Sequence, residues 1–195
     1  MNNRKVYISG EIVPEVDAKI SIFDSAVLLG DTVTESTRTF NFKPFKLDEH
    51  LERLYKSFKL TRIDPQMTIE EMKKVSLELL EINKDNYKAN EDCWLVHNIS
   101  RGHSITGGNP ALQVSKPTVM IYTQPMNLVL WAPFYTKGCH AVTPPTRMVP
   151  SQSLDARIKN RSRLFYTLAE IEAKLVDPDA QSVIPVSYTH LTLPT

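Results

Sequence analysis

A short basic stretch late in the chain, residues 155–163, places the amine of Lys159 among three arginines. The apolar residues that follow recur at spacings of four, three and four, which predicts an amphipathic helix with Asn160 or Ser162 as its N-cap. A helix N-terminus carries partial positive charge, and this charge and the arginines should both favour a free amine over an ammonium. A free amine is the group that forms a Schiff base with an aldehyde cofactor.

Two other interpretations of this stretch remain open on these residues alone. A solvated basic turn that opens a helix is the simpler one. A phosphate-binding patch is the second, because helix N-termini and arginines both attract anions. A stretch farther upstream, described below, favours the Schiff-base interpretation.

The composition excludes several classes of function. The chain has 195 residues, 42% of them hydrophobic and 23% charged, with a formal net charge of +1, as expected of an ordinary globular protein. A charge this small gives no electrostatic case for nucleic acid or for a membrane surface. No window is long and apolar enough for a membrane span, and metal-site spacings of Cys and His are absent. Cys93 and Cys139 are expected to be reduced thiols of a cytoplasmic protein.

The elements that must position Lys159 are predicted from periodicity and turn residues. Alternation and β-branched residues predict strands over residues 6–13 (as a hairpin), 18–23, 33–40, 93–100, 118–123 and 139–143, with a further one in 146–150. Two amphipathic helices are predicted between them, one capped by Asp48 and one by Thr68, which forms a capping box with Glu71.

Three segments together resemble the class IV aminotransferases, which have the type IV fold and use pyridoxal 5'-phosphate. The segments are residues 30–35 (GDTVTE), 46–54 (KLDEHLERL) and 157–160 (RIKN). The family includes branched-chain amino acid, D-amino acid and (R)-amine aminotransferases, and aminodeoxychorismate lyase as a relative that does not transaminate. The resemblance runs from about Val6 to about Asp179.

The resemblance implies roles at the matching positions. Lys159 would bind the cofactor covalently and later move the substrate α-proton. Arg53 would hold the cofactor phosphate, a role suited to a guanidinium fork. Without the resemblance, Arg53 would be interpreted as a surface arginine paired with Glu49 one helical turn away.

The resemblance also implies candidate substrate-binding residues, namely Thr34, Arg38 and Arg101. Several relatives carry an aromatic residue at the position of Thr34, so this residue departs from the pattern and leaves the substrate open. The expected reaction moves an amino group from a branched-chain or similar apolar amino acid to a 2-oxo acid. The alternatives are the lyase, a D-amino acid or (R)-amine aminotransferase, and a truncated fragment that binds only phosphate, the cofactor or nothing.

The expected architecture is a mixed α/β (α+β) protein. A small N-terminal domain, residues 1–124, has an antiparallel sheet covered by two helices, and a linker, 125–133, leads to the beginning of a barrel-like cofactor-binding domain, 134–181. Residues 182–195 are interpreted as a non-native tail, and the chain as an N-terminal part of a homodimeric enzyme. The apolar run 128–131 is a candidate dimer contact or an internal one.

Overall fold

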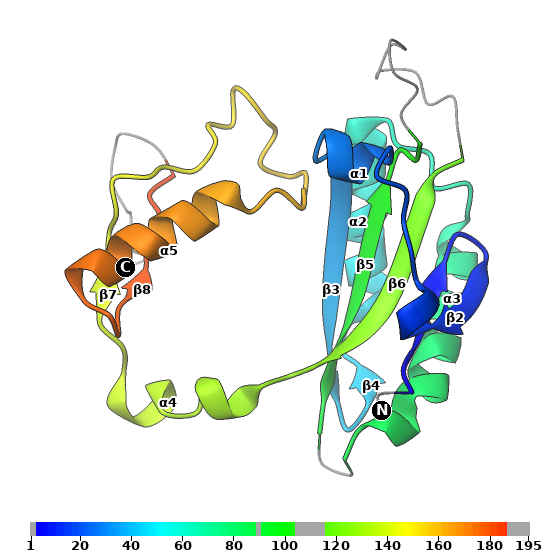
Figure 1. The fold of residues 1–195 in the computed structure, drawn as a ribbon, viewed down its shortest axis with the longest axis horizontal. Helices are drawn as coiled ribbons and strands as arrows, with labels where there is room; N and C mark the ends of the chain where they lie inside the picture. Colours follow the sequence, from blue (N-terminus) through cyan, green and yellow to red (C-terminus); the bar gives the residue numbers. More distant parts are fainter. Residues whose placement is uncertain (1–2, 89–90, 104–115, 187–195) are drawn as a thin grey trace. The chain divides into compact units, whose positions relative to one another are not determined.

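A computed structural model describes residues 3–88, 91–103 and 116–186 of the chain (Figure 1). It divides into two compact units, one of residues 1–126 with 157–161 and the other of residues 127–156 with 162–195. The short segment that contains Lys159 therefore belongs to the first unit, although the sequence around it belongs to the second. The last part of the predicted tail, residues 187–195, lies outside the described residues.

The first unit is built on a six-stranded sheet in the order β2-β1-β6-β5-β3-β4, and every neighbouring pair is antiparallel (Figure 1). The strands are β1 (Lys5–Ile8), β2 (Glu11–Pro14), β3 (Thr32–Phe40), β4 (Lys43–Pro44), β5 (Cys93–Ser100) and β6 (Thr118–Pro125). Long strands form where β-branched residues are dense, as in β3. The predicted mixed α/β fold with an antiparallel sheet is confirmed.

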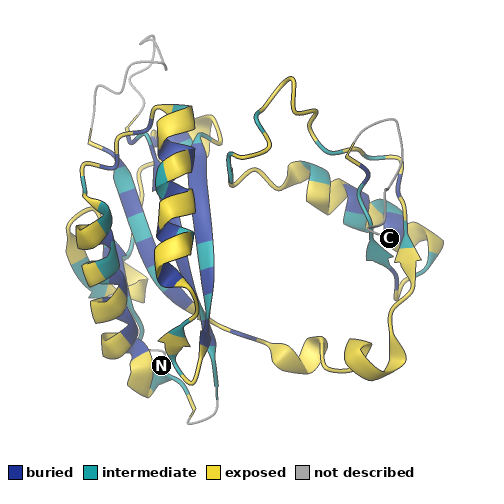
Figure 2. Cartoon of the chain, turned by 180° about the vertical axis from the view of Figure 1, so that it is seen from behind, coloured by how far each residue is buried: buried dark blue, intermediate teal, exposed yellow. Residues whose placement is uncertain are grey.

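Two helices, α2 (Leu47–Thr61) and α3 (Ile69–Asn83), cover one face of this sheet (Figure 1). Figure 2 shows their outer faces exposed and the strands behind them buried. Their inner faces form one core with the central strands, and its fully buried members include Leu51, Leu54, Met72, Leu79, Leu95, Ile99 and Ile121. Burying apolar side chains at helical spacing against alternating strand residues is what holds this layer on the sheet.

The helix ends differ in how far local sequence predicts them. The capping box is confirmed, because the Thr68 hydroxyl accepts from the backbone of Glu71 and the Glu71 carboxylate accepts from the backbone of Thr68. The prediction that Asp48 caps α2 is wrong. The N-cap is Lys46, in the left-handed conformation with φ +54° and with no side-chain cap, so Asp48 lies inside the first turn, where its charge favours the helix dipole.

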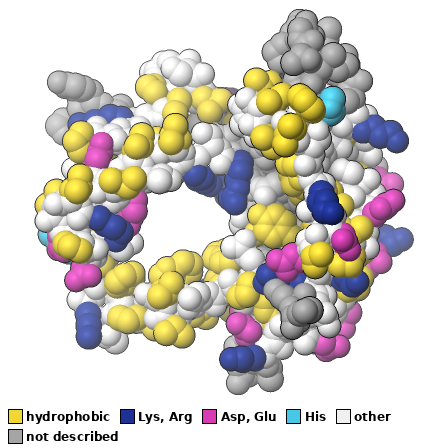
Figure 3. Space-filling model, viewed as in Figure 1, with side chains coloured by type: hydrophobic (Ala, Val, Ile, Leu, Met, Phe, Trp, Pro, Cys, Tyr) yellow, Lys and Arg dark blue, Asp and Glu magenta, His cyan; other side chains and the backbone are white. Residues whose placement is uncertain are grey.

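The strand predicted over residues 18–23 is also wrong. A 3-10 turn (Glu15–Asp17) leads into an extended segment, and the short helix α1 (Ser25–Leu28) follows, capped by Asp24. Apolar residues at this end of the unit are exposed and gather into a patch over α1 in Figure 3; they are Phe23, Val27, Leu28 and Leu29. The alternating apolar residues of this segment, Ile20 and Ile22, are 37% and 70% exposed and pair with no strand.

The second unit contains η3 (Leu128–Leu130), α4 (Phe134–Lys137), β7 (Ala141–Val142), α5 (Leu164–Val176) and β8 (Gln181–Ser182). β7 and β8 pair in parallel, and residues 146–150 form no strand, contrary to the prediction. Helix α5 exists, but it buries Ala169 and Ala173 while its predicted apolar stripe stays exposed. Small residues are the ones that face the two short strands within this unit.

None of the helices in the described residues is both long and apolar enough to cross a bilayer. In the same part of the chain, no three of the side chains that commonly ligate metals come together.

Candidate active site

A buried carboxylate, that of Glu35, lies at the centre of the candidate site. Strand alternation places Glu35 on the same face of β3 as Val33 and Thr37, which is the face covered by α2. Its side chain has no solvent-exposed surface. An ionised carboxylate in such a position requires cationic or hydrogen-bonding partners.

Helix α2 supplies two of these partners, His50 and Arg53, which are three residues apart and therefore project from the same side of the helix. The Arg53 guanidinium donates from Nε to Oε2 of Glu35 and from Nη2 to Oε1, each at 2.7 Å. The His50 ring approaches Oε1 through Nδ1 at 3.1 Å. Two parallel bonds make the arginine contact a fork, the geometry in which arginine and carboxylate interact most strongly.

The third partner comes from residues 157–161. The backbone of Lys159 accepts from the N–H of Thr34, and the N–H of Arg161 donates to the carbonyl of Thr32, both at 2.9 Å, so this segment lines the free edge of β3. Its side chain then reaches back over the edge, and Nζ donates to Oε1 of Glu35 at 2.9 Å. Lys159 and Arg53, the two residues predicted to share a cofactor, therefore meet at one carboxylate oxygen.

The local setting of Lys159 differs from the sequence prediction. Helix α5 begins only at Leu164, its N-cap Arg163 makes no side-chain cap, and neither Asn160 nor Ser162 serves as one. The nearest charged partner of the amine is an acidic group and not a helix N-terminus. The amine is thus paired with a carboxylate and does not lie in the uniformly positive surroundings that the sequence predicted.

Burial and hydrogen bonding have opposite effects on the pKa of Glu35. Burial raises the pKa of this carboxyl, but hydrogen bonds from Arg53, from the backbone N–H of Ser36 and from Lys159 outweigh it and lower the pKa to about 2. The pKa of Arg53 is raised in turn, chiefly by its hydrogen bond to Glu35. Glu35 is therefore negatively charged at neutral pH and is too weak a base to take protons from a substrate.

A neutral histidine lies beside Glu35 in the sheet. His97 is fully buried opposite Glu35 in the register of β3 and β5, and burial lowers its pKa to about 4. Its Nε2 is 2.8 Å from the hydroxyl of Ser76 on α3. The uncharged ring forms the floor of the site without adding a charge to it.

The three residues predicted to bind substrate do not join this cluster through their side chains. The Thr34 hydroxyl is buried and donates to the carbonyl of His97 at 2.9 Å. The Arg38 guanidinium lies 3.8 Å from the centre of its neighbouring Phe40 ring.

Arg101 is engaged at a different place. It forms a fork with Asp31 and also donates to the carbonyls of Thr61, the last residue of α2, and of its C-cap Arg62. The loop that follows it, residues 104–115, lies outside the described residues.

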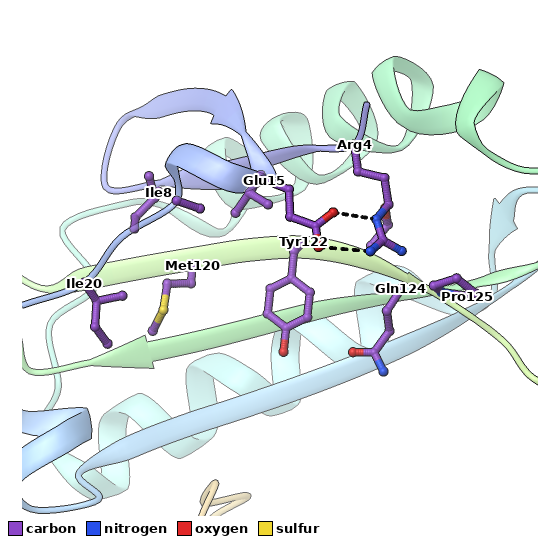
Figure 4. Close-up of a pocket in the computed structure, with 11 residues that line it drawn as sticks. Arg4, Ile8, Glu15, Ile20, Met120, Tyr122, Gln124 and Pro125 are labelled. Carbon is purple, nitrogen blue, oxygen red and sulfur yellow. Dashed lines mark hydrogen bonds and ion pairs between the residues drawn. The ribbon is translucent and has the colours of Figure 1, made fainter. Parts of the chain in front are cut away.

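A separate hollow of about 470 Å³ lies on the face of the sheet that α2 and α3 do not cover. Figure 4 shows apolar side chains at one end, such as Ile8, Ile20 and Met120, and the ion pair of Arg4 with Glu15 at the other. Neither Lys159 nor any of its partners lines this hollow. It is therefore not the candidate site.

Residues 32–186 match the family model described as amino-transferase class IV, which is most of the chain. The chain belongs to this family. The resemblance drawn from the three sequence segments is thereby confirmed. Within the family, the chain is 35% identical over 175 residues to the putative branched-chain-amino-acid aminotransferase of Methanocaldococcus jannaschii, covering 90% of this chain and 57% of that protein. It is 32% identical over 120 residues to a D-alanine aminotransferase of Staphylococcus epidermidis, covering 62% of this chain and 41% of the relative.

Solved branched-chain amino acid aminotransferases share the fold. The Escherichia coli enzyme superposes with a TM-score of 0.79 at 22% identity, covering 90% of this chain and 57% of that one. The enzyme of the archaeon Thermoproteus uzoniensis, crystallised with norvaline, gives 0.74 at 24% identity, covering 94% and 60%. The chain thus spans a little over half the length of these relatives.

Sequence reasoning missed two members of the cluster, His50 and the central Glu35. The signal for Glu35 was a single acidic residue in a strand otherwise rich in β-branched residues, on the same face as Val33 and Thr37. A lone carboxylate on a buried strand face calls for cations from elsewhere in the chain, and this chain has two candidates in Arg53 and Lys159.

Proposed function

We propose that this chain is the part of a pyridoxal phosphate-dependent aminotransferase that carries the lysine and the phosphate-binding arginine. The observation that supports this best is the meeting of Lys159 and Arg53 at one oxygen of Glu35. A phosphorylated aldehyde needs an amine for its aldehyde end and a cation for its phosphate end, both within reach of one small molecule. Membership of the class IV aminotransferases agrees with this pairing.

The residues present fit such a cofactor. The Lys159 side chain is 28% exposed and that of Arg53 is 52% exposed, so both are open to a ligand although the carboxylate beneath them is not. Glu35 engages Nε and Nη2 of Arg53, which leaves Nη1 outside this fork and suited to a phosphate oxygen. Bound pyridoxal phosphate supplies the electron sink that stabilises negative charge at the substrate α-carbon.

The residues of the chain then have distinct tasks. Arg53 holds the phosphate by charge and by its rigid fork. Lys159 anchors the aldehyde end and afterwards moves the proton at the substrate α-carbon as general base. The hydrogen bond from Thr34 to the Lys159 carbonyl fixes the backbone from which the amine projects.

For the substrates, we propose an apolar amino acid, branched-chain or similar, as amino donor and a 2-oxo acid as acceptor. The names of the relatives support aminotransfer and include both branched-chain and D-alanine enzymes. D-amino acids, (R)-amines and lyase chemistry on the same fold stay as alternatives, because Thr34 departs from the aromatic residue of several relatives. Thr34, Arg38 and Arg101 remain proposed substrate-binding residues, and their side chains contact the backbone of His97, the ring of Phe40 and Asp31 respectively.

We also propose a homodimer in the cytoplasm. Exposed apolar residues from Leu128 to Trp131 support a contact between copies, with Val129 80% exposed. Both cysteines are free thiols, which supports a reducing compartment.

The test of cofactor binding is spectroscopic. The 195-residue chain mixed with pyridoxal phosphate should develop a visible absorption band that borohydride bleaches irreversibly, and mass spectrometry should find the label on Lys159. Lys159→Ala should abolish both signals. Lys56→Ala is the matched control, since that amine is exposed on the outside of α2, and it should behave as the wild type. A label spread over several lysines, or no uptake at all, would leave only a phosphate-binding or inactive chain.

The reaction itself is tested with the complete gene product. Amino transfer from glutamate to apolar 2-oxo acids should exceed transfer from D-alanine. Consumption of aminodeoxychorismate without amino transfer would instead favour the lyase.

A further inference from the structure

The Glu35 carboxylate joins two segments that are far apart in the sequence. Its Oε1 atom is approached by Nη2 of Arg53 at 2.7 Å, by Nζ of Lys159 at 2.9 Å and by Nδ1 of His50 at 3.1 Å. The glutamate is the fully buried member of the cluster, and Lys159 stands 124 residues away from it in the chain. The Glu35 carboxylate is therefore the group that both Arg53 and Lys159 contact.

The contact with Arg53 fixes the orientation of the guanidinium group as well as its distance from Glu35. A fork through Nε and Nη2 holds the guanidinium plane, so the remaining amino group, Nη1, has a set direction. An unpaired arginine side chain would have to lose rotamer freedom when it binds an anion, whereas one already held by a carboxylate loses less. The fork thus prepares Arg53 for a second anionic partner.

The contact with Lys159 fixes the other end. Because Nζ and Nη2 share one oxygen atom, the separation of the amine from the guanidinium is set by Glu35 and not by either side chain alone. The same hydrogen bond engages the amine, so Nζ has to leave the carboxylate before it can attack an aldehyde.

We propose that Glu35 is a positioning residue that sets the spacing of Arg53 and Lys159 and restrains the amine until a phosphorylated aldehyde is seated. This inference rests on the proposed function for its ligand, but its effect on the amine can be measured without any cofactor. Glu35 acts through its neighbours and is not itself a proton carrier in the reaction. The other titratable groups that face it are His50 on α2 and His97 on β5.

Two measurements on the 195-residue chain test the proposal, with Glu35→Gln as the variant and Glu49→Gln as control. Glu49 undergoes the same chemical change, but it is exposed and pairs with Lys46 at the surface. The first measurement is the affinity for pyridoxine 5'-phosphate, which has the phosphate but no aldehyde. The second is the rate at which Lys159 is methylated by formaldehyde and cyanoborohydride, read by mass spectrometry.

The expected changes are opposite in direction. Glu35→Gln should weaken binding of pyridoxine 5'-phosphate by about tenfold, the worth of one charge-assisted hydrogen bond, because Arg53 is no longer oriented. The same substitution should speed methylation of Lys159 several-fold, because the amine is no longer engaged by a carboxylate. The control variant should change neither quantity. If Glu35 only stabilised the fold, its substitution would lower the melting temperature. It would not both weaken binding of pyridoxine 5'-phosphate and speed methylation of Lys159.

The outcomes are separable. If the wild type binds no pyridoxine 5'-phosphate, the proposed function fails, and the methylation rate alone then decides the role of Glu35. If Glu35→Gln is folded and methylates Lys159 at the wild-type rate, the proposal is overturned. Should Glu35→Gln not fold, Glu35→Asp keeps the charge but is one methylene too short to reach both partners. That variant should show the same changes to a smaller degree, and wild-type values would overturn the proposal.

Discussion

The backbone N–H of Thr34 donates to the carbonyl oxygen of Lys159 at 2.9 Å, so the lysine lies beside β3 as an added edge and not at the start of a helix. The position of the amine therefore depends on hydrogen bonds of the backbone on either side of it. The second of these runs from the N–H of Arg161 to the carbonyl of Thr32.

Arg161→Pro removes that second donor, because proline has no N–H. We expect the variant to lose about 1 kcal/mol of unfolding free energy and to bind pyridoxal phosphate more weakly, since the segment is then held by one bond less. Arg161→Ala keeps the donor and should resemble the wild type in both respects. Urea denaturation and the visible absorption band measure the two effects. Equal losses in both variants would mean that the side chain, and not the backbone, holds the segment.

The low pKa of Glu35 predicts how stability depends on pH. The folded-state pKa, about 2, is below the ordinary value of 4.5, so the contribution of this carboxylate is complete above about pH 5 and is lost as the pH falls toward 2. Glu35→Gln should therefore destabilise the chain at pH 7, by about 3 kcal/mol at most, and by progressively less at pH 4 and pH 3. Urea midpoints of both proteins across this range would measure the difference. A gap that stays constant with pH would contradict the assignment.

Arg53 is expected to act on the phosphate end of the cofactor only. Arg53→Lys keeps a positive charge but cannot form the fork, so affinity for pyridoxal phosphate should fall by about tenfold or more. Affinity for pyridoxal, which has no phosphate, should change little. Titrations followed by absorbance compare the two ligands, and Lys56→Ala on the same helix serves as control. Equal weakening toward both ligands would argue against a phosphate role.

Arg101 should stabilise the fold through the end of α2. Arg101→Ala removes the fork with Asp31 and two donors to the terminal carbonyls of the helix, and we expect a loss of about 1–3 kcal/mol. Arg101→Lys should recover only part of it. Arg38→Ala, which loses a stacked contact with Phe40, should cost less, about 0.5–1 kcal/mol. Chemical denaturation gives all three values, and a larger loss for Arg38 would reverse the assignment.

The buried histidine should remain neutral under mildly acidic conditions. Burial lowers the pKa of His97 to about 4, below its ordinary value of 6.5, so the unfolded chain takes up this proton before the folded one does. The folded state should consequently lose stability as the pH falls from about 6.5 toward 4. In NMR spectra, the ring proton shifts of His97 should not titrate between about pH 7.5 and 5. A midpoint near the ordinary value of 6.5 for this residue would show that the ring is accessible to water.

The parts of the fold that sequence predicts are those with a local pattern. The helices α2 and α3 have apolar residues at helical spacing, and the capping box of Thr68 and Glu71 marks a start that the structure keeps. Strand β6 alternates between buried and partly exposed residues over most of its length, whereas almost all of β5 is buried. The segment 18–23 also alternates, but strand pairing needs a neighbouring strand as well as alternation, and Ile20 and Ile22 are exposed without one.

The surroundings of Lys159 were beyond local reasoning. Residues 158–161 pair with β3, which lies far away in the sequence. Neither of the two segments has a local pattern that indicates this pairing. The predicted pair of Lys159 and Arg53 came from the resemblance, and the structure brings these residues together. Glu35 was missed because its role depends on both Lys159 and Arg53. The role of a carboxylate on a buried face can be interpreted only after its cationic partners are known.

The chain enters the second unit at residue 127, returns to the first at 157 and leaves it again at 162. A ribosome therefore releases Glu35, His50 and Arg53 well before the lysine, and these three residues can meet before Lys159 has been made. Lys159 is synthesised last, after the whole of residues 127–156. Newly made chains are thus expected to recognise an anion before they are able to bind an aldehyde.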